Sequence, residues 1–209
     1  MGPYSTRRVV VIVNPTAGNG RAARIRPEVE RALRSHGLTF AVFATAGPGD
    51  ATSLASTAVE SGCDLVIAVG GDGTLNEVVN GLLANRALTP PTLGVVSCGS
   101  GCDFIRSLGI PRGVPAVAVI ARGNTRLIDV GRVTYEANDG QSVGRYFVNA
   151  GDLGLGAEVA ERVNRSGKPL GGFITFLWHS VVTLAGARFK TVSIPVSYTH
   201  LTLPTIYSV

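Results

Sequence analysis

One short stretch of the sequence has residues whose types and spacing could bind a charged ligand. Residues 70–76 read GGDGTLN and are followed by Glu77; an apolar run, Leu65–Val69, precedes them and an amphipathic stretch follows. A buried strand, a glycine-rich turn and a helix start therefore meet here. Glycines let a ligand approach the backbone, and the first amides of a helix attract anions. Because Asp72 would repel a bare phosphate, the loop predicts a nucleoside triphosphate with Mg²⁺, and we expect a positive φ at Gly73.

Three further polar turns follow three other apolar runs. Numbered along the chain, with the glycine-rich turn as the third, the first has the sequence NPTAG at 14–18, the second is Thr45 after residues 38–44, and the fourth has the sequence SCGSGCDF at 97–104. In the fourth turn, Ser100 can donate to a phosphate and Asp103 can hold a metal through water. Open α/β sheets bind ligands at the carboxyl ends of their strands, so we expect all four turns to share one crevice.

The elements that must position these turns alternate between strand and helix. The patterns predict strands at 8–13, 38–44, 65–69 and 93–96, and helices at 21–36, 51–61 and 75–85. Asp50 is the expected cap of the second helix and Gly37 the residue that ends the first. This rhythm is typical of an open parallel α/β sheet.

The rhythm stops near residue 125. Strands are expected at 126–133, 144–149 and 191–195, with one helix at 173–187. We therefore predict a nucleotide-binding α/β domain at 1–125 and the start of a β-rich second domain at 126–195. Residues 196–205 are also what a transposase mosaic-end sequencing adapter encodes, which predicts an adapter-derived tail at 196–209. The alternative is an ordinary strand.

Composition limits the classes of protein further. The 209 residues are 45% hydrophobic and 16% charged, with a net charge of +5, as in a globular chain. Five arginines on one predicted helix, without interleaved aromatic residues, favour a solvated face near phosphate over nucleic-acid binding. Three cysteines without C-x-x-C spacing predict free thiols. No signal peptide or membrane span is recognised, so a cytoplasmic protein that can touch a membrane surface is expected.

The turns together resemble the diacylglycerol kinase catalytic-domain family of lipid kinases, whose wider superfamily includes sphingosine and NAD kinases. Residues 70–76 match the family motif without change, and Asn14-Pro15-x-x-Gly18 and Thr45 match its first two turns. The fourth turn departs from the family, which usually has Pro, Gly-Thr and Asn-Asp where this chain has Ser97, Gly99-Ser100 and Cys102-Asp103.

The resemblance implies an ATP-dependent kinase that phosphorylates a hydroxyl of diacylglycerol or a related lipid at a membrane surface, with ATP and Mg²⁺ as cofactors. It implies no nucleic-acid partner and leaves a homodimer open. The candidate cofactor-binding residues are Asn14, Pro15, Thr16, Ala17, Gly18, Thr45, Gly71, Asp72, Gly73, Thr74, Leu75, Asn76, Glu77 and Ser100.

No catalytic or metal-binding residue is assigned from the sequence, because the family places its general base beyond residue 195. The 209-residue chain is therefore expected to be inactive in phosphoryl transfer. Two alternatives stay open: an NAD kinase-like enzyme with a soluble substrate, and a nucleotide-binding fragment without turnover.

Overall fold

A computed structural model describes residues 8–84, 89–99, 101–137, 139–150, 155–165, 172–186 and 202–206. The chain forms two compact units, one of residues 1–149 with 200–209 and one of residues 150–199. Each unit is described by itself. The boundary predicted at 125 stays a prediction.

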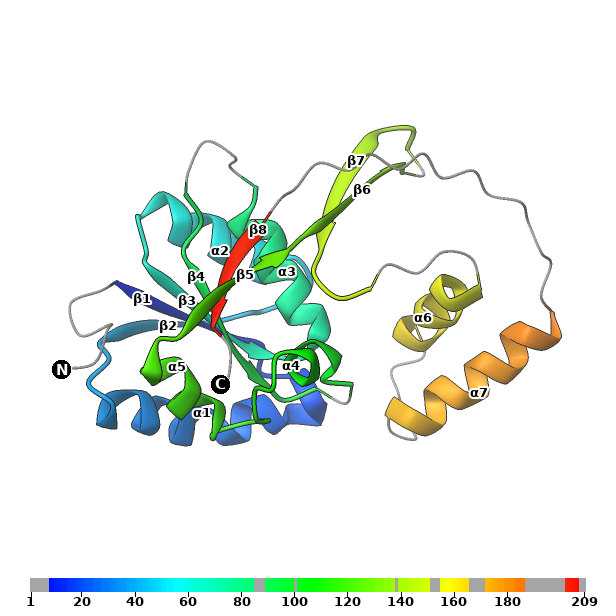
Figure 1. Ribbon diagram of the computed structural model, residues 1–209. Helices are drawn as coiled ribbons and strands as arrows, with labels where there is room; N and C mark the ends of the chain where they lie inside the picture. Colours follow the sequence, from blue (N-terminus) through cyan, green and yellow to red (C-terminus); the bar gives the residue numbers. More distant parts are fainter. Residues whose placement is uncertain are drawn as a thin grey trace. The chain divides into compact units, whose positions relative to one another are not determined.

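A six-stranded sheet organises the first unit (Figure 1). Its strands in spatial order are β2 (Phe40–Ala44), β1 (Val9–Val13), β3 (Leu65–Gly70), β4 (Thr92–Ser97), β8 (Thr202–Ile206) and β5 (Thr125–Asp129). The strands from β2 to β8 run parallel, and β5 pairs antiparallel with β8. This confirms the expected mixed α/β fold with a mostly parallel sheet.

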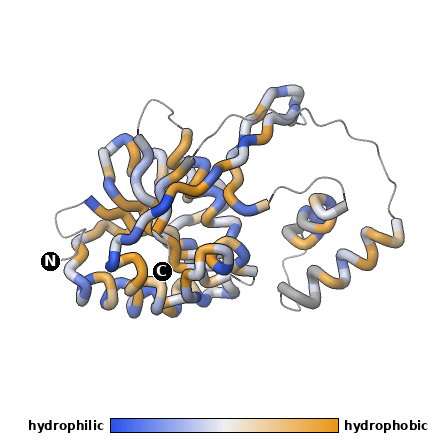
Figure 2. Tube along the Cα trace, viewed as in Figure 1, coloured by the Kyte–Doolittle hydropathy of each residue, from blue (hydrophilic) through white to orange (hydrophobic). Residues whose placement is uncertain are grey.

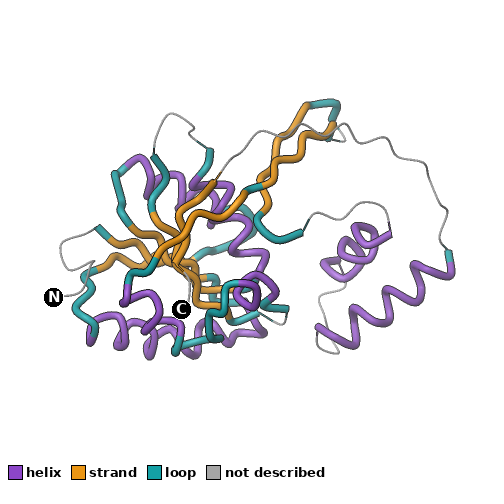
Figure 3. The backbone as a smooth tube through the Cα atoms, in the orientation of Figure 1, coloured by secondary structure: helices purple, strands orange, loops and turns teal. Residues whose placement is uncertain are grey.

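The central strands are apolar along their whole length because helices cover both faces of the sheet. Every residue of β3 is buried, and Figure 2 shows hydrophobic residues gathered along these strands. The covering helices are α1 (Ala17–Ser35), α2 (Asp50–Glu60), α3 (Asp72–Leu82) and α5 (Ala116–Arg122). Helix α1 contacts α5 and α2 contacts α3, so the two pairs form layers around the strands (Figure 3).

Two local predictions about these helices are wrong. Helix α3 begins at Asp72, three residues before the predicted start, so Gly73 is helical and does not have a positive φ. The N-cap of α2 is Gly49 and not Asp50. The carboxylate of Asp50 instead accepts bonds from the amides of Ala46 and Gly47, which closes the preceding turn.

The regular part of α1 begins at Arg21, as predicted, and an irregular turn from Ala17 precedes it. Gly18, Asn19 and Gly20 all have positive φ between Ala17 and the regular part of α1. The predicted end is confirmed, since Gly37 follows the helix with a φ of +77°, as expected for a residue that terminates a helix.

Three strands follow one another after residue 125, as expected from the change of rhythm. The predicted strand 126–133 is divided into β5 and β6 (Gly131–Glu136), and β6 forms an antiparallel hairpin with β7 (Ser142–Phe147). The short helix α4 (Asp103–Ser107) precedes them. The predicted strand 191–195 lies outside the described residues.

The described part of the second unit consists of α6 (Leu155–Arg165) and α7 (Gly172–Ala185). The sequence analysis predicted α7 but not α6. Leu177, Trp178, Val181 and Leu184 of α7 are all more than half exposed. Across the described residues, every helix is too short or too polar to cross a bilayer.

Strand β8 comes from the segment for which an adapter origin is predicted. Its Leu203, Thr205 and Ile206 are buried in the sheet. The position of β8 does not test the origin of residues 196–209, which stays a prediction.

Candidate active site

The predicted turns meet at one edge of the sheet because their strands are parallel and in register. The amide of Asn14 donates to the Val69 carbonyl, Thr45 donates to Val13, and Cys98 donates to Gly70, at 2.7–2.9 Å. These bonds join the residues that follow β1, β2 and β4 to neighbouring strand ends. The carboxyl ends of β2, β1, β3 and β4 therefore form one continuous rim.

Side-chain bonds link the first turn to the glycine-rich turn. The amide nitrogen of Asn14 donates to the Thr74 hydroxyl at 3.0 Å, while its amide oxygen accepts from both the backbone and the hydroxyl of Thr16. Asn14 is thus fixed by partners on two turns. Thr74 is buried at the start of α3, where the first backbone amides have no acceptor within the helix.

Glycines allow the fourth turn to pack against the first and third turns. A Cβ at Gly18, whose φ is +61°, would overlap the carbonyl oxygen of Cys98. A Cβ at Gly99 would lie 2.8 Å from the α-carbon of Gly71. The backbones therefore touch directly, and side chains at these two glycines would push the turns apart.

Two carboxylates flank the fourth turn. A Cβ at Gly101 would lie 3.0 Å from Asp72 Oδ2 and 3.3 Å from Asp103 Oδ2, so both acids border the same small space. Asp72 Oδ2 also accepts the Cys102 amide at 3.0 Å. Among the described residues, no group of three or more His, Cys, Asp or Glu side chains is arranged to hold a metal. Two neighbouring carboxylates suit Mg²⁺, which usually keeps several waters and binds substrate phosphates.

Arginines surround the same turn. Arg112 donates to the carbonyl oxygens of Gly99 and Cys98, and Arg106 donates to Gly101 O at 3.2 Å and to Asp103 at 2.9 Å. Burial raises the pKa of the Cys98 thiol, with the nearby Arg21 guanidinium opposing this shift. The thiol therefore stays neutral near pH 7 and adds no negative charge to a site suited to phosphate.

Comparisons with known proteins agree with this geometry. The family described as the diacylglycerol kinase catalytic domain matches residues 8–133. The chain belongs to this family.

Among its curated relatives, a diacylglycerol kinase of Bacillus subtilis (strain 168) is 36% identical over 192 residues, or 90% of this chain and 59% of the relative. A diacylglycerol kinase of Staphylococcus epidermidis is 40% identical over 146 residues, or 68% of this chain and 42% of the relative. The crystal structure of a diacylglycerol kinase from Bacillus anthracis str. Sterne superimposes with a TM-score of 0.56 at 28% identity, covering 75% of this chain and 54% of that one. The chain therefore spans about half the length of these relatives.

The structure of this diacylglycerol kinase family member separates the predicted site residues into groups. Asn14, Thr16, Gly18, Thr45 and the residues 71–74 line the rim or its turns. Pro15 is partly buried within the first turn, and Ala17 packs against the core. These assignments to cofactor binding stay predictions.

The remaining predicted residues have other surroundings. Leu75 is a buried core residue, and the backbone carbonyl of Glu77 accepts the Thr52 hydroxyl. The amide nitrogen of Asn76 donates to the Tyr146 carbonyl in the β6–β7 hairpin. Ser100 lies outside the described residues.

Sequence reasoning missed Arg106, Arg112 and Asn80. Arg112 is 13 residues from the glycine whose carbonyl it binds, and no motif marks such a pair. Asn80 is a buried polar residue next to the buried apolar residues Val78 and Val79, and a polar residue in such a stretch is the signal that could have found it.

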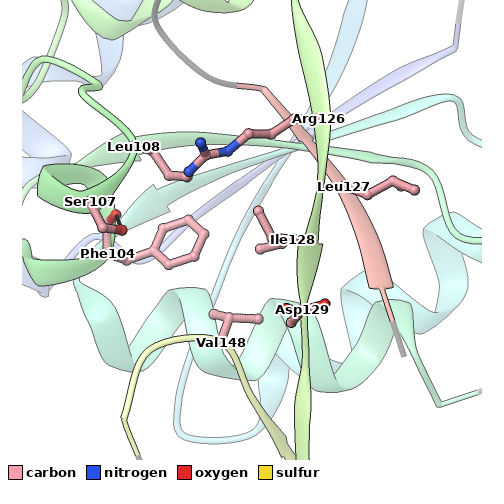
Figure 4. A pocket seen from close by; sticks show the side chains of 8 residues that line it. All are labelled: Phe104, Ser107, Leu108, Arg126, Leu127, Ile128, Asp129 and Val148. Carbon is pink, nitrogen blue, oxygen red and sulfur yellow. Dashed lines mark hydrogen bonds between the residues drawn. The ribbon is translucent and has the colours of Figure 1, made fainter. Parts of the chain in front are cut away.

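A hollow of about 350 Å³ lies beside α4, immediately after Asp103 in the chain. In Figure 4, Phe104 of α4 and Ile128 of β5 face each other across it. Leu108 and Val148 complete an apolar wall, and Ser107, Arg126 and Asp129 form its polar part. Such a lining suits a ligand with both apolar and polar groups.

Proposed function

We propose that this chain contains the nucleotide-binding part of an ATP-dependent lipid kinase that phosphorylates a hydroxyl of diacylglycerol or a related lipid in phospholipid metabolism. The observation that carries the proposal is the joining of three turns at the carboxyl ends of β1, β3 and β4, with two carboxylates beside them. Family membership supports the lipid acceptor, since the matched relatives are named diacylglycerol kinases.

ATP would lie with its phosphates over the start of α3. The unpaired amides of the first helical turn and the dipole of the helix favour phosphate there. A Cβ at Gly73 would meet no atom within 4 Å, so this face of the turn is open to a ligand. Asn14, Thr16 and Thr45 offer polar groups along the same rim, and Arg106 and Arg112 add positive charge.

Asp72 and Asp103 are the residues that would hold Mg²⁺. A bound Mg²⁺ would neutralise part of the negative charge on the phosphates during transfer. Asp72 also accepts the Cys102 amide, and Arg106 pairs with Asp103. The bond to the backbone amide orients Asp72 before any ligand arrives, which lowers the ordering cost of binding. The ion pair of Asp103 is exposed.

The acceptor would be a lipid presented at a membrane surface. The hollow beside α4, which has both apolar and polar lining residues, offers space for the part of such a molecule near its hydroxyl, and the exposed apolar residues of α7 suit contact with lipid. We propose a cytoplasmic protein that associates with the membrane surface, and a homodimer stays open. No nucleic-acid partner is proposed.

No general base is assigned within the described residues. Glu158 forms an ion pair with Arg162 at 2.8 Å on the exposed surface of α6. Such a pair is typical of an ordinary residue on a helix surface. Asp152 lies outside the described residues. We therefore propose that the 209-residue chain binds nucleotide but does not complete phosphoryl transfer.

Two measurements on two proteins test the proposal. Equilibrium binding of a fluorescent ATP analogue with Mg²⁺ is measured on the 209-residue chain. Transfer of radiolabelled phosphate from ATP to diacylglycerol in mixed micelles is measured on this chain and on a longer chain in which the remainder of the Bacillus subtilis relative replaces residues 196–209. We expect binding by both chains and transfer by the longer chain alone.

Transfer to NAD and not to diacylglycerol would replace the lipid-kinase proposal with the NAD kinase alternative. Absence of nucleotide binding by both chains would refute the nucleotide site itself. Robust transfer by the 209-residue chain would show that its base lies within the present sequence.

A further inference from the structure

Asn80 makes an unusual set of bonds for a side chain in the middle of a helix. It is only 7% exposed, and its amide oxygen accepts the backbone N–H of Tyr146 at 2.9 Å. Its amide nitrogen donates to the backbone carbonyl of the same residue at 2.9 Å. One side chain of α3 therefore satisfies both backbone groups of one residue of β7.

Asn76 extends this network by one helical turn. Its amide nitrogen donates to the Tyr146 carbonyl at 3.1 Å, and its amide oxygen accepts from Asn80 at 3.3 Å. A backbone N–H can only donate and a carbonyl can only accept, so these partners fix the orientation of both amides. Residues four apart lie on the same helix face, which explains how both reach one strand position.

The bonds hold the hairpin as an additional strand would hold it. In an antiparallel pair, alternate residues direct their N–H and C=O away from the partner strand. Tyr146 is paired with Arg132 of β6, and its own N–H and C=O bond to α3. Asn80 therefore takes the place of a neighbouring strand at the free edge of β7. Since buried polar groups left unpaired are costly, this attachment is specific to one position.

We propose that Asn80 is a positioning residue for phosphoryl transfer, because it fixes the β6–β7 hairpin to the helix that begins in the glycine-rich turn. Helix α3 begins at Asp72, so a rigid helix joins the proposed phosphate-binding residues to the attached hairpin. The first unit ends at Asn149, two residues after β7. The attachment thus sets where the chain leaves the nucleotide-binding unit. This inference rests on the proposed function.

The test uses Asn80→Asp and Asn80→Leu, with Asn124→Asp as the charge-matched control. Asn124 is exposed just before β5. Leucine removes both bonds to Tyr146 and keeps the same branching at Cγ. An ionised aspartate accepts the Tyr146 N–H but repels its carbonyl oxygen, whereas a protonated one can donate to that oxygen. Burial favours the protonated form, so the two bonds to Tyr146 should form again in Asn80→Asp as the pH falls.

Three quantities are measured: amide exchange at Tyr146, affinity for the Mg·ATP analogue, and kcat of the longer chain described above. At about pH 8, we expect both Asn80 variants to speed Tyr146 exchange and lower kcat about tenfold, with ATP affinity changed less than about threefold. At about pH 5.5, the Tyr146 exchange rate and kcat of Asn80→Asp should return to the values of the parent at that pH. Those of Asn80→Leu should not. The control should match the parent throughout.

Unchanged Tyr146 exchange and kcat in Asn80→Leu would overturn the inference. So would equal losses in both Asn80 variants that persist at the lower pH, because a general loss of packing would not respond to one proton. A parent that neither binds nor transfers phosphate refutes the proposed function instead, and the exchange data still report on the attachment. If Asn80→Leu does not fold, the pH response of Asn80→Asp decides.

Discussion

Gly18 shows how single residues control the proposed site. Its φ of +61° and its contact with the Cys98 carbonyl both require the absence of a side chain. Gly20, two residues later, has a φ of +77° but nothing within 4 Å of its Cβ position. Substitutions at Gly18 and Gly20 can therefore distinguish the cost of a strained backbone from the cost of steric overlap between turns.

Gly18→Ala should lower the free energy of unfolding by more than about 2 kcal/mol, because strain and overlap add. Gly20→Ala should lower it by about 1 kcal/mol, the cost of the left-handed backbone alone. Denaturant unfolding measures both. Equal losses in the two variants would mean that the first turn moves away from Cys98 without cost.

The charge of Asp72 can be removed while its bond to the backbone is kept. In Asp72→Asn the side-chain oxygen still accepts the Cys102 amide, so the thermal midpoint should change by less than about 2 °C. Affinity for the ATP analogue should fall about tenfold with Mg²⁺ present and change little with EDTA. A similar loss with and without Mg²⁺ would contradict the assignment of Asp72 to the metal.

At the scale of elements, helix α3 joins three roles: it packs on α2, begins in the glycine-rich turn and holds the hairpin. Its two glycines differ in surroundings. A Cβ at Gly81 would overlap the Thr52 carbonyl and lie 2.7 Å from the Ala55 side chain, whereas a Cβ at Gly73 meets open space.

Gly81→Ala should destabilise the fold by about 2 kcal/mol, because overlap with α2 outweighs the gain in helix propensity. Gly73→Ala should leave stability unchanged or raise it by up to about 1 kcal/mol. The same change should weaken binding of the ATP analogue, since the methyl group enters the proposed phosphate space. Full affinity in Gly73→Ala would show that nucleotide does not approach this turn.

Elements whose signals are local could be predicted from the sequence. Continuous apolar runs such as Leu65–Val69 identify buried strands without any knowledge of their partners, and the motif after that run placed the site at their carboxyl ends. The start of α3 was misplaced because glycine has low helix propensity, although Asp72 and Gly73 are helical in this context.

Features that depend on distant partners could not be predicted. Arg112 reaches a carbonyl whose position depends on the path of the chain between Gly99 and α5. Asn80 reads as an ordinary helix residue until β7 lies beside it. Neither the insertion of β8 between β4 and β5 nor its pairing is encoded by a local pattern, since each depends on the assembled sheet.

At the scale of the whole molecule, β8 joins β5 to the rest of the sheet. It pairs with β5 over five residues and with β4 at the single pair Leu93–Thr205. Pro204 has no N–H to donate and is unusual inside a sheet. The position between β4 and β5 is therefore occupied by a strand poorly suited to it.

Resequencing the source locus tests the predicted adapter origin of residues 196–209. A genomic reading frame that runs unchanged through these residues would refute it.

Removal of residues 196–209 should destabilise the first unit and promote association, because β5 loses its partner and the edge of β4 is uncovered. Denaturant unfolding and size-exclusion chromatography measure the two effects. The matched control removes residues 207–209 only, which follow β8. An unchanged unfolding midpoint in the larger deletion would show that β8 contributes nothing to the sheet.

The place of β8 also has a consequence for the order in which the protein folds. Strand β4 is complete at Ser97, but the strand that lies beside it begins only at Thr202. Pairings so distant in sequence form slowly because a long loop must close first. During synthesis, the turns around Asp72 would therefore emerge and pack while the neighbouring edge of the sheet is still unpaired. We expect the rim to assemble early and the sheet to close last, so the interval before β8 docks is when the nascent chain is most exposed to aggregation.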